Sequence, residues 1–129
     1  MGYTANFTGN FSLDKALSED HSKLIEALSN KRHDSELMPS NYCQWVIGVD
    51  KKTILWDGRE KFYSSDKWIA FIVSILEPLG YIVNGKVSWK GEDKSDVGTI
   101  RIKNNKIKIW SNARNQKQGK EVIQNQLPY

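Results

Sequence analysis

Hydrophobic and polar positions alternate with a period of two along residues 3–13. This spacing predicts a β-strand with one buried and one solvated face. The period then changes to that of a helix, with Ser18 or Asp14 available as an N-cap. The apolar side of this first helix is expected to carry Leu17, His21, Leu24, Ile25 and Leu28.

Two short apolar runs follow, at residues 43–49 and 53–56, and the polar residues 50–52 between them predict a hairpin. A second helix is expected to begin at Ser64 or Ser65 and to end at Pro78 and Gly80. Its apolar positions form a wide stripe, which predicts burial against the sheet. They are Trp68, Phe71, Ile72, Ile75, Leu76 and Leu79.

Strand alternation resumes over residues 81–89, and residues 98–110 are expected to form a hairpin that turns at Asn104-Asn105. The order of elements predicts an α+β fold with an antiparallel sheet and two helices packed on one face. We expect a ferredoxin-like β-α-β-β-α-β core with an extra C-terminal β-hairpin strand.

The chain has 129 residues, of which 39% are hydrophobic, so one core of moderate size is expected. Residues 1–110 are predicted to form a single α+β domain. Residues 111–129 are polar and basic, rich in Asn, Gln and Lys, and are expected to be a flexible tail or a weak helix.

The positive charge is concentrated near the C-terminal end of the chain. Residues 1–98 carry 12 Lys or Arg against 14 Asp or Glu, whereas residues 99–129 carry 7 against 1. A local excess of this kind favours phosphates, nucleic acid or an acidic protein surface as partner, although charge runs are also often only solvated.

A two-residue turn at Asn104-Asn105 would set the register of the last hairpin. It would put four isoleucines on one face and a group of cations on the other, where like charges would oppose one another at a small energetic cost. The predicted ligand-binding residues on that face are Lys86, Lys90, Arg101, Lys103, Lys106, Lys108 and Trp110. The alternative is a solvated face, or an edge protected from aggregation by lysines.

A second candidate site combines aromatic and acidic residues around the middle hairpin, a combination that can hold a flat or cationic ligand. Its residues are Trp45, Trp56, Asp57, Glu60 and Tyr63. The alternative is that these aromatic residues belong to the core.

Glu92, Asp93 and Asp96 could bind a hard cation, but their spacing does not match a calcium loop, so no metal is expected. His21 and His33 lack partners at zinc spacing. Cys43 could act as a nucleophile only if a histidine approached it. The chain has none of the common hydrolase, metalloprotease, phosphate-loop or dinucleotide motifs, and no cofactor is expected.

A single cysteine excludes an intramolecular disulfide, and no run of apolar residues approaches the length that crosses a bilayer. No basic-then-apolar signal segment opens the chain. We therefore expect a cytoplasmic protein that does not bind membranes, with its oligomeric state left open.

The chain carries a distinctive series of short words, which are Met1-Gly2-Tyr3, Cys43-Gln44-Trp45, Trp56-Asp57-Gly58, Glu60-Lys61-Phe62-Tyr63, Gly80-Tyr81, Asn84-Gly85, Val87, Trp89 and Gly91-Glu92-Asp93. In this series it resembles a family of small, largely uncharacterised bacterial and phage proteins. The resemblance implies a phage or prophage accessory protein that binds a host component, and it implies no catalytic residues.

The function expected from these observations is that of a small non-enzymatic binding protein or inhibitor. Its basic sheet face would engage an acidic host protein, a nucleotide or a nucleic acid. The alternative is an enzyme that uses carboxylates at Asp57 and Glu60, or at Glu92, Asp93 and Asp96.

Overall fold

The computed structural model describes residues 5–34, 36–59, 62, 64–111 and 120–122. Its elements are β1 (Ala5–Leu13), α1 (Glu19–Ser29), β2 (Trp45–Ile47), β3 (Thr53–Trp56), α2 (Ser65–Leu76), β4 (Val83–Gly91), β5 (Val97–Lys103), β6 (Lys106–Ser111) and β7 (Lys120–Val122). All of the expected elements are present. Within residues 111–129, the structure describes Ser111 at the end of β6 and the strand β7; the rest of the expected tail lies outside the described residues.

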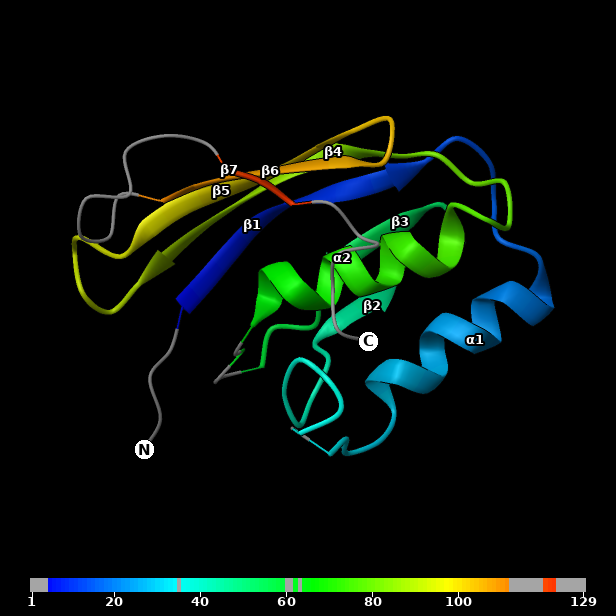
Figure 1. Ribbon diagram of the computed structural model, residues 1–129, viewed down its shortest axis with the longest axis horizontal. Coiled ribbons are helices and arrows are strands. Elements are labelled where there is room, and N and C mark those ends of the chain that lie inside the picture. Colours follow the sequence, from blue (N-terminus) through cyan, green and yellow to red (C-terminus); the bar gives the residue numbers. More distant parts are fainter. Residues whose placement is uncertain (1–4, 35, 60–61, 63, 112–119, 123–129) are drawn as a thin grey trace.

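The described strands form one antiparallel sheet in the order β2-β3-β1-β4-β5-β6-β7. Both helices lie on the same side of this sheet, with α2 beneath β1 and β3 and α1 further out, next to β2 (Figure 1). The predicted α+β class with an antiparallel sheet and two helices is confirmed. The opposite side of the sheet, called here the outer face, has no helix over it in the described part of the chain.

The pairing of β1 with β4 joins the two halves of the sheet over nine residue pairs, from Ala5 opposite Gly91 to Leu13 opposite Val83. Two glycines let the strands approach closely. A Cβ on Gly9 would lie 2.5 Å from the carbonyl oxygen of Lys86, and one on Gly85 would lie 2.6 Å from that of Asn10. Both glycines have positive φ, so any other residue at either position would be strained.

Helix α2 provides most of the helical contribution to the core. Its six fully buried residues are Trp68, Ile69, Ala70, Ile72, Val73 and Leu76. The expected burial of this helix is confirmed. Leu79 does not extend its apolar stripe as expected, because the helix ends at Leu76 and the Leu79 side chain is 38% exposed.

Helix α1 begins as expected, with the Ser18 hydroxyl accepting a hydrogen bond from the backbone N–H of His21. Its buried face differs from the expected one. Leu24 is 53% exposed, whereas Ser22 and Ile25 are buried. The Ser22 hydroxyl donates to the Glu26 carboxylate and accepts from Lys51 Nζ at 3.0 Å, so a polar contact with the β2–β3 turn replaces an apolar one. Sequence periodicity counts apolar residues and therefore misses this arrangement.

His33 lies in the charged connection after α1. Its side chain is buried, with Nε2 2.7 Å from the carbonyl oxygen of Leu28 and the ring centroid 5.0 Å from that of Trp68. It is therefore a hydrogen-bonded core histidine that ties the end of α1 to α2.

The last hairpin turns at Asn104 and Asn105, which have φ of 49° and 69°. Positive φ at both central residues is the requirement of the tight turn predicted from the sequence. The register is also as predicted, with Lys103 opposite Lys106 and the remaining pairs in step. Asn105 does more than turn the chain, because its buried side chain accepts from Val83 N–H at 2.6 Å and donates to the Tyr81 carbonyl at 2.9 Å.

Replacement of Asn105 by Gly should therefore keep the turn but lose both side-chain bonds. We expect Asn105→Gly to lower the free energy of unfolding by about 1–3 kcal/mol, because a buried N–H and a buried carbonyl lose partners. Asn104→Gly is the matched control. Asn104 is exposed, and we expect a change within about 0.5 kcal/mol. Urea unfolding of both variants measures the difference. Equal losses of unfolding free energy would contradict the stabilising role assigned to the Asn105 side chain.

Ile72 lies fully buried at the centre of the α2 face. Ile72→Ala should cost about 2–5 kcal/mol, because it removes buried methyl groups and leaves a cavity. Ile82→Ala is the control, since that side chain is 40% exposed. A loss below about 0.5 kcal/mol for Ile72→Ala in urea unfolding would contradict the central position of α2 in the core.

Candidate anion-binding face of the sheet

The alternation of β4, β5 and β6 separates the core from a basic surface. Ile100, Ile102 and Ile107 are buried and Ile109 is partly buried on the helix side. The seven predicted binding residues all lie on the outer face and all are exposed. They are Lys86, Lys90, Arg101, Lys103, Lys106, Lys108 and Trp110, and they form what is called here the basic face.

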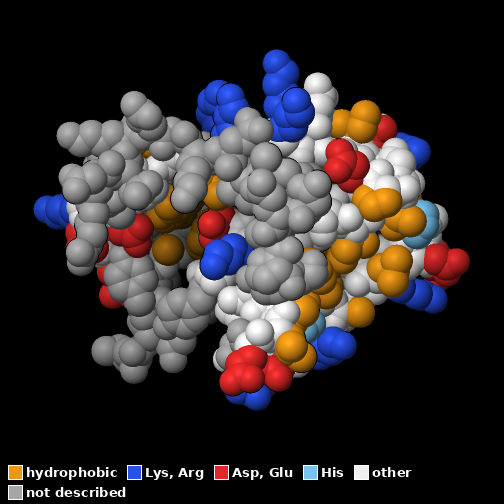
Figure 2. Space-filling view, in the orientation of Figure 1, with side chains coloured by type: hydrophobic (Ala, Val, Ile, Leu, Met, Phe, Trp, Pro, Cys, Tyr) orange, Lys and Arg blue, Asp and Glu red, His pale blue; other side chains and the backbone are white. Residues whose placement is uncertain are grey.

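Three cations lie in a row across neighbouring strands. Lys86 on β4 is opposite Arg101 on β5, and Arg101 is opposite Lys108 on β6. A second pair, Lys103 and Lys106, follows next to the turn. Lys and Arg side chains project from the outer side of the sheet in the space-filling view (Figure 2).

A row of hydroxyl groups runs alongside the cation row. Thr8 on β1 is opposite Ser88, Ser88 is opposite Thr99, and Thr99 is opposite Trp110. The Ser88 and Thr99 hydroxyl oxygens are 3.1 Å apart, so one donates to the other. On β1, Asn10 continues the cation row beside Lys86.

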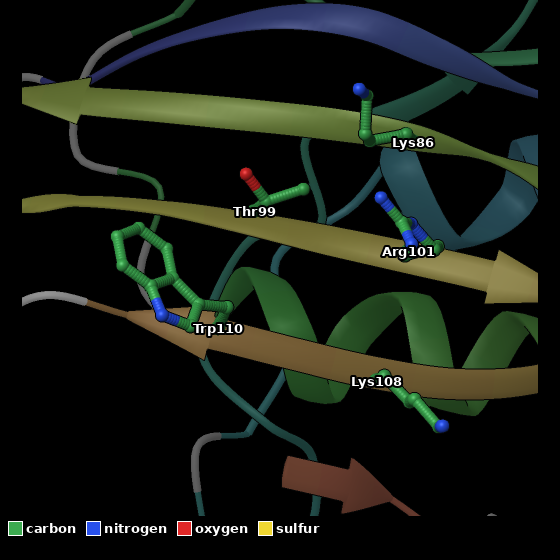
Figure 3. Close-up of a pocket in the computed structure, with 5 residues that line it drawn as sticks. All are labelled: Lys86, Thr99, Arg101, Lys108 and Trp110. Atoms are coloured by element: carbon green, nitrogen blue, oxygen red, sulfur yellow. The ribbon is translucent and has the colours of Figure 1, made fainter. Parts of the chain in front are cut away.

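Part of the basic face is hollowed into an open depression of about 320 Å³, lined by Lys86, Thr99, Arg101, Lys108 and Trp110. Figure 3 shows Lys86 and Arg101 close together on neighbouring strands, with the indole of Trp110 leaning toward β5 and Lys108 turned away from Arg101. Four of the five lining residues were predicted. Thr99 was not among the predicted residues, although a turn at Asn104-Asn105 puts it directly opposite Trp110.

Two cations of the depression, Lys86 and Arg101, are not neutralised by any side chain that the structure describes. Lys86 and Arg101 form no ion pair with any described side chain of residues 5–111, and the ion pairs that the structure does describe involve Lys23, Lys51 and Arg59. Lys108 is directly opposite Glu121 of β7. Like charges on directly opposite residues destabilise a sheet by about 0.2–1 kcal/mol for each pair. An anion bound between them would remove that repulsion.

The second candidate site lies mostly in the core. Trp45 is fully buried, and its indole donates to the carbonyl of Ser65 at 2.9 Å. The Phe7 ring packs against the rings of Trp45, Trp56 and Phe62, with centroid distances of 5.8, 5.3 and 5.5 Å. These contacts favour the core interpretation of the aromatic residues.

The acidic part of that second site is engaged locally. One oxygen of the Asp57 carboxylate accepts the backbone N–H of Arg59 at 2.9 Å, and the other lies 3.7 Å from Arg59 Nε. Asp57 therefore stabilises the turn after β3. Glu60 and Tyr63 lie outside the described residues.

The carboxylates between β4 and β5 support the loop. Asp96 accepts a hydrogen bond from the indole of Trp89 at 3.0 Å, and that ring covers Gly98, where a Cβ would lie 2.2 Å from it. Asp93 accepts from both the N–H and the hydroxyl of Ser95, which hold the pKa of its carboxyl below the usual range. Over the described ranges, no three His, Cys, Asp or Glu side chains are grouped so as to hold a metal ion.

Cys43 and the histidines are also placed in structural roles. Cys43 is buried, and burial raises the pKa of its thiol to about 12, so the nucleophilic thiolate is scarce at neutral pH. His21 Nδ1 lies 2.7 Å from the Tyr81 hydroxyl, and the two rings pack edge to face. No histidine contact with Cys43 occurs among the described hydrogen bonds.

Comparison with protein-family models finds no match to this chain, and neither curated proteins nor solved structures give a significant match. Neither described helix has the length and apolar character needed to cross a membrane.

The environment of Cys43 predicts slow thiol chemistry. In the folded protein at neutral pH, a disulfide reagent such as dithionitrobenzoate should react with Cys43 only as fast as the surrounding structure opens, because the thiol is protonated and covered. In guanidinium chloride one thiol per chain should react at once. Rapid reaction without denaturant would show an accessible thiolate and would reopen the case for a nucleophile.

Proposed function

We propose that this protein is a non-enzymatic binding protein that engages an anionic partner through the basic face. The observation that carries the proposal is the row of Lys86, Arg101 and Lys108 along an open depression that Trp110 also lines, with no described ion pair at Lys86 or Arg101. Cations placed next to one another on a fixed sheet bind an anion without first having to be brought together.

Protection of a sheet edge is a weaker explanation for these charges. Lysines that prevent aggregation are typical of edge strands. Here β4 lies between β1 and β5, and β5 lies between β4 and β6, so neither is an edge. The cations on these interior strands therefore carry the cost of mutual repulsion without protecting unpaired backbone groups.

The enzyme alternative receives less support. No described carboxylate lines the depression. Asp57 and Asp96 hold neighbouring parts of the chain. The hydrogen bonds from Ser95 lower the pKa of the Asp93 carboxyl, whereas a general acid at neutral pH needs a raised one.

The finer fold and the biological setting are proposed on separate grounds. We propose that β1 to β4 with α1 and α2 form a ferredoxin-like core that β5 to β7 extend. The order β2-β3-β1-β4 within the longer sheet supports this. A phage or prophage accessory protein that acts on a host component is supported by the resemblance of the residue words.

The proposal predicts salt-sensitive binding to a simple polyanion. Immobilised inorganic polyphosphate should bind the protein, and Arg101→Ala with Lys108→Ala should weaken binding by about tenfold or more, since two charged contacts are lost. The dependence of affinity on salt should flatten, because fewer counterions are displaced. Biolayer interferometry at several salt concentrations measures both effects.

Lys31→Ala with Arg32→Ala is the matched control. It removes the same kinds of charge from exposed positions just after α1, and polyphosphate affinity should change little. If both double variants lose affinity equally, the binding depends on net charge and the basic face is only a solvated surface.

A further inference from the structure

We infer that the anionic partner of the basic face is a single-stranded nucleic acid, with a base stacked on Trp110 and backbone phosphates held by the row of Lys86, Arg101 and Lys108. This inference rests on the proposed function and specifies the class of its ligand. It is carried by the position of one exposed aromatic ring beside a cation row, within a single shallow depression.

The spacing of these groups fits the repeating unit of a nucleic acid. Trp110 and Lys108 lie on the same side of β6 two residues apart, which is about 7 Å along a strand. Arg101 is directly opposite Lys108, and Thr99 is directly opposite Trp110. A nucleotide likewise carries a flat base and a charged phosphate separated by one sugar, so the two parts of one nucleotide can reach adjacent rows.

The two rows cross the sheet together. The aromatic and hydroxyl row consists of Trp110, Thr99, Ser88 and Thr8, and the cation row consists of Lys108, Arg101 and Lys86 with Asn10 at its end. Each row crosses four strands, a width of about 14 Å. Four-stranded sheets that bind RNA place about two or three bases across such a width.

The hydroxyl and amide groups suit the remaining parts of the same ligand. Ser88 and Thr99 hydroxyls can donate to or accept from a sugar hydroxyl or a base edge, and Asn10 provides both a donor and an acceptor. On β1, β4, β5 and β6, no acidic side chain points to the outer face among the described residues. A phosphate backbone would therefore meet no repulsive charge from these four strands; Glu121 of β7 is opposite Lys108, at the margin of the cation row.

Other anions use this arrangement less completely. An acidic protein surface presents carboxylates at the ends of side chains. These would bind the cations but would not stack on the indole of Trp110. In a duplex the bases are stacked inside the helix, so Trp110 could reach only sugar and phosphate. Unpaired bases expose their faces, and stacking of a base on an aromatic side chain contributes about 1–3 kcal/mol.

The test compares a labelled oligodeoxythymidine with base-free polyphosphate. Trp110→Ala should weaken oligonucleotide binding roughly 5- to 150-fold, the equivalent of one lost stacking contact. The salt slope should remain largely unchanged, and polyphosphate affinity should remain unchanged. Trp110→Phe, which keeps an aromatic ring, should restore most of the oligonucleotide affinity. Fluorescence anisotropy measures the oligonucleotide, and interferometry measures polyphosphate.

Two further variants provide the matched comparison. Tyr42→Ala removes an aromatic side chain that is 54% exposed in the loop before β2, and it should leave oligonucleotide affinity unchanged. Arg101→Ala with Lys108→Ala should weaken binding of both probes and flatten the oligonucleotide salt slope by roughly 1.4, at about 0.7 for each lost phosphate contact. Retained polyphosphate binding by Trp110→Ala also shows that this variant is folded.

Each remaining outcome separates the inference from the proposed function. Suppose that Arg101 and Lys108 are needed to bind both probes but that Trp110→Ala binds the oligonucleotide like wild type. The nucleic-acid inference is then wrong, and the proposed function still holds for an anionic partner of another kind. Tighter, Trp110-dependent binding of heparin would overturn it in favour of an anionic polysaccharide. Tighter binding of the corresponding duplex would overturn the requirement for unpaired bases. If no polyanion binds, both proposals fail.

Discussion

The arrangement of the outer half of the sheet depends on one turn, at Asn104 and Asn105. Because side chains alternate along a strand, the register that this turn sets decides which residues of β5 and β6 face α2 and which face solvent. With Lys103 opposite Lys106, the isoleucines enter the core and the cations share the outer face. A slip of one residue would bury Arg101 and Lys108 and expose Ile100 and Ile109. Asn105 accepts a hydrogen bond from Val83 at the start of β4 and donates one to Tyr81 just before it, and these bonds oppose such a slip because they fix the turn to a third strand.

The same turn explains how much of the basic face could be predicted. A short apolar alternation on each side of two asparagines specifies both the hairpin and its register, so the sequence alone places Arg101 opposite Lys108. Helix α2 was predictable for a similar reason, since its apolar stripe is wide and continuous. In both cases the signal is local and repeats several times, and tertiary contacts support it.

The features that the sequence alone did not predict have a common physical origin in contacts between distant segments. Burial of Ser22 in place of Leu24 depends on Lys51, which belongs to a turn far along the chain. Burial of His33 depends on Trp68 and on the free carbonyl at the end of α1. The role of Asp96 depends on Trp89, whose ring needs the space that Gly98 leaves. A polar residue that is satisfied by a distant partner looks, in the sequence, like any other polar residue.

The two faces of the sheet therefore have different roles, stability for the inner face and binding for the outer face. The inner face is occupied by the helices and by large apolar residues, and substitutions there change stability. No described helix packs against the outer face of β4, β5 and β6, so its residues can be chosen for their charge at the cost of only mild repulsion between neighbours. That separation is why alanine at Arg101 or Lys108 should alter binding without unfolding the domain. A loss of binding in such variants can then be attributed to the face itself, because the core that fixes its geometry remains intact.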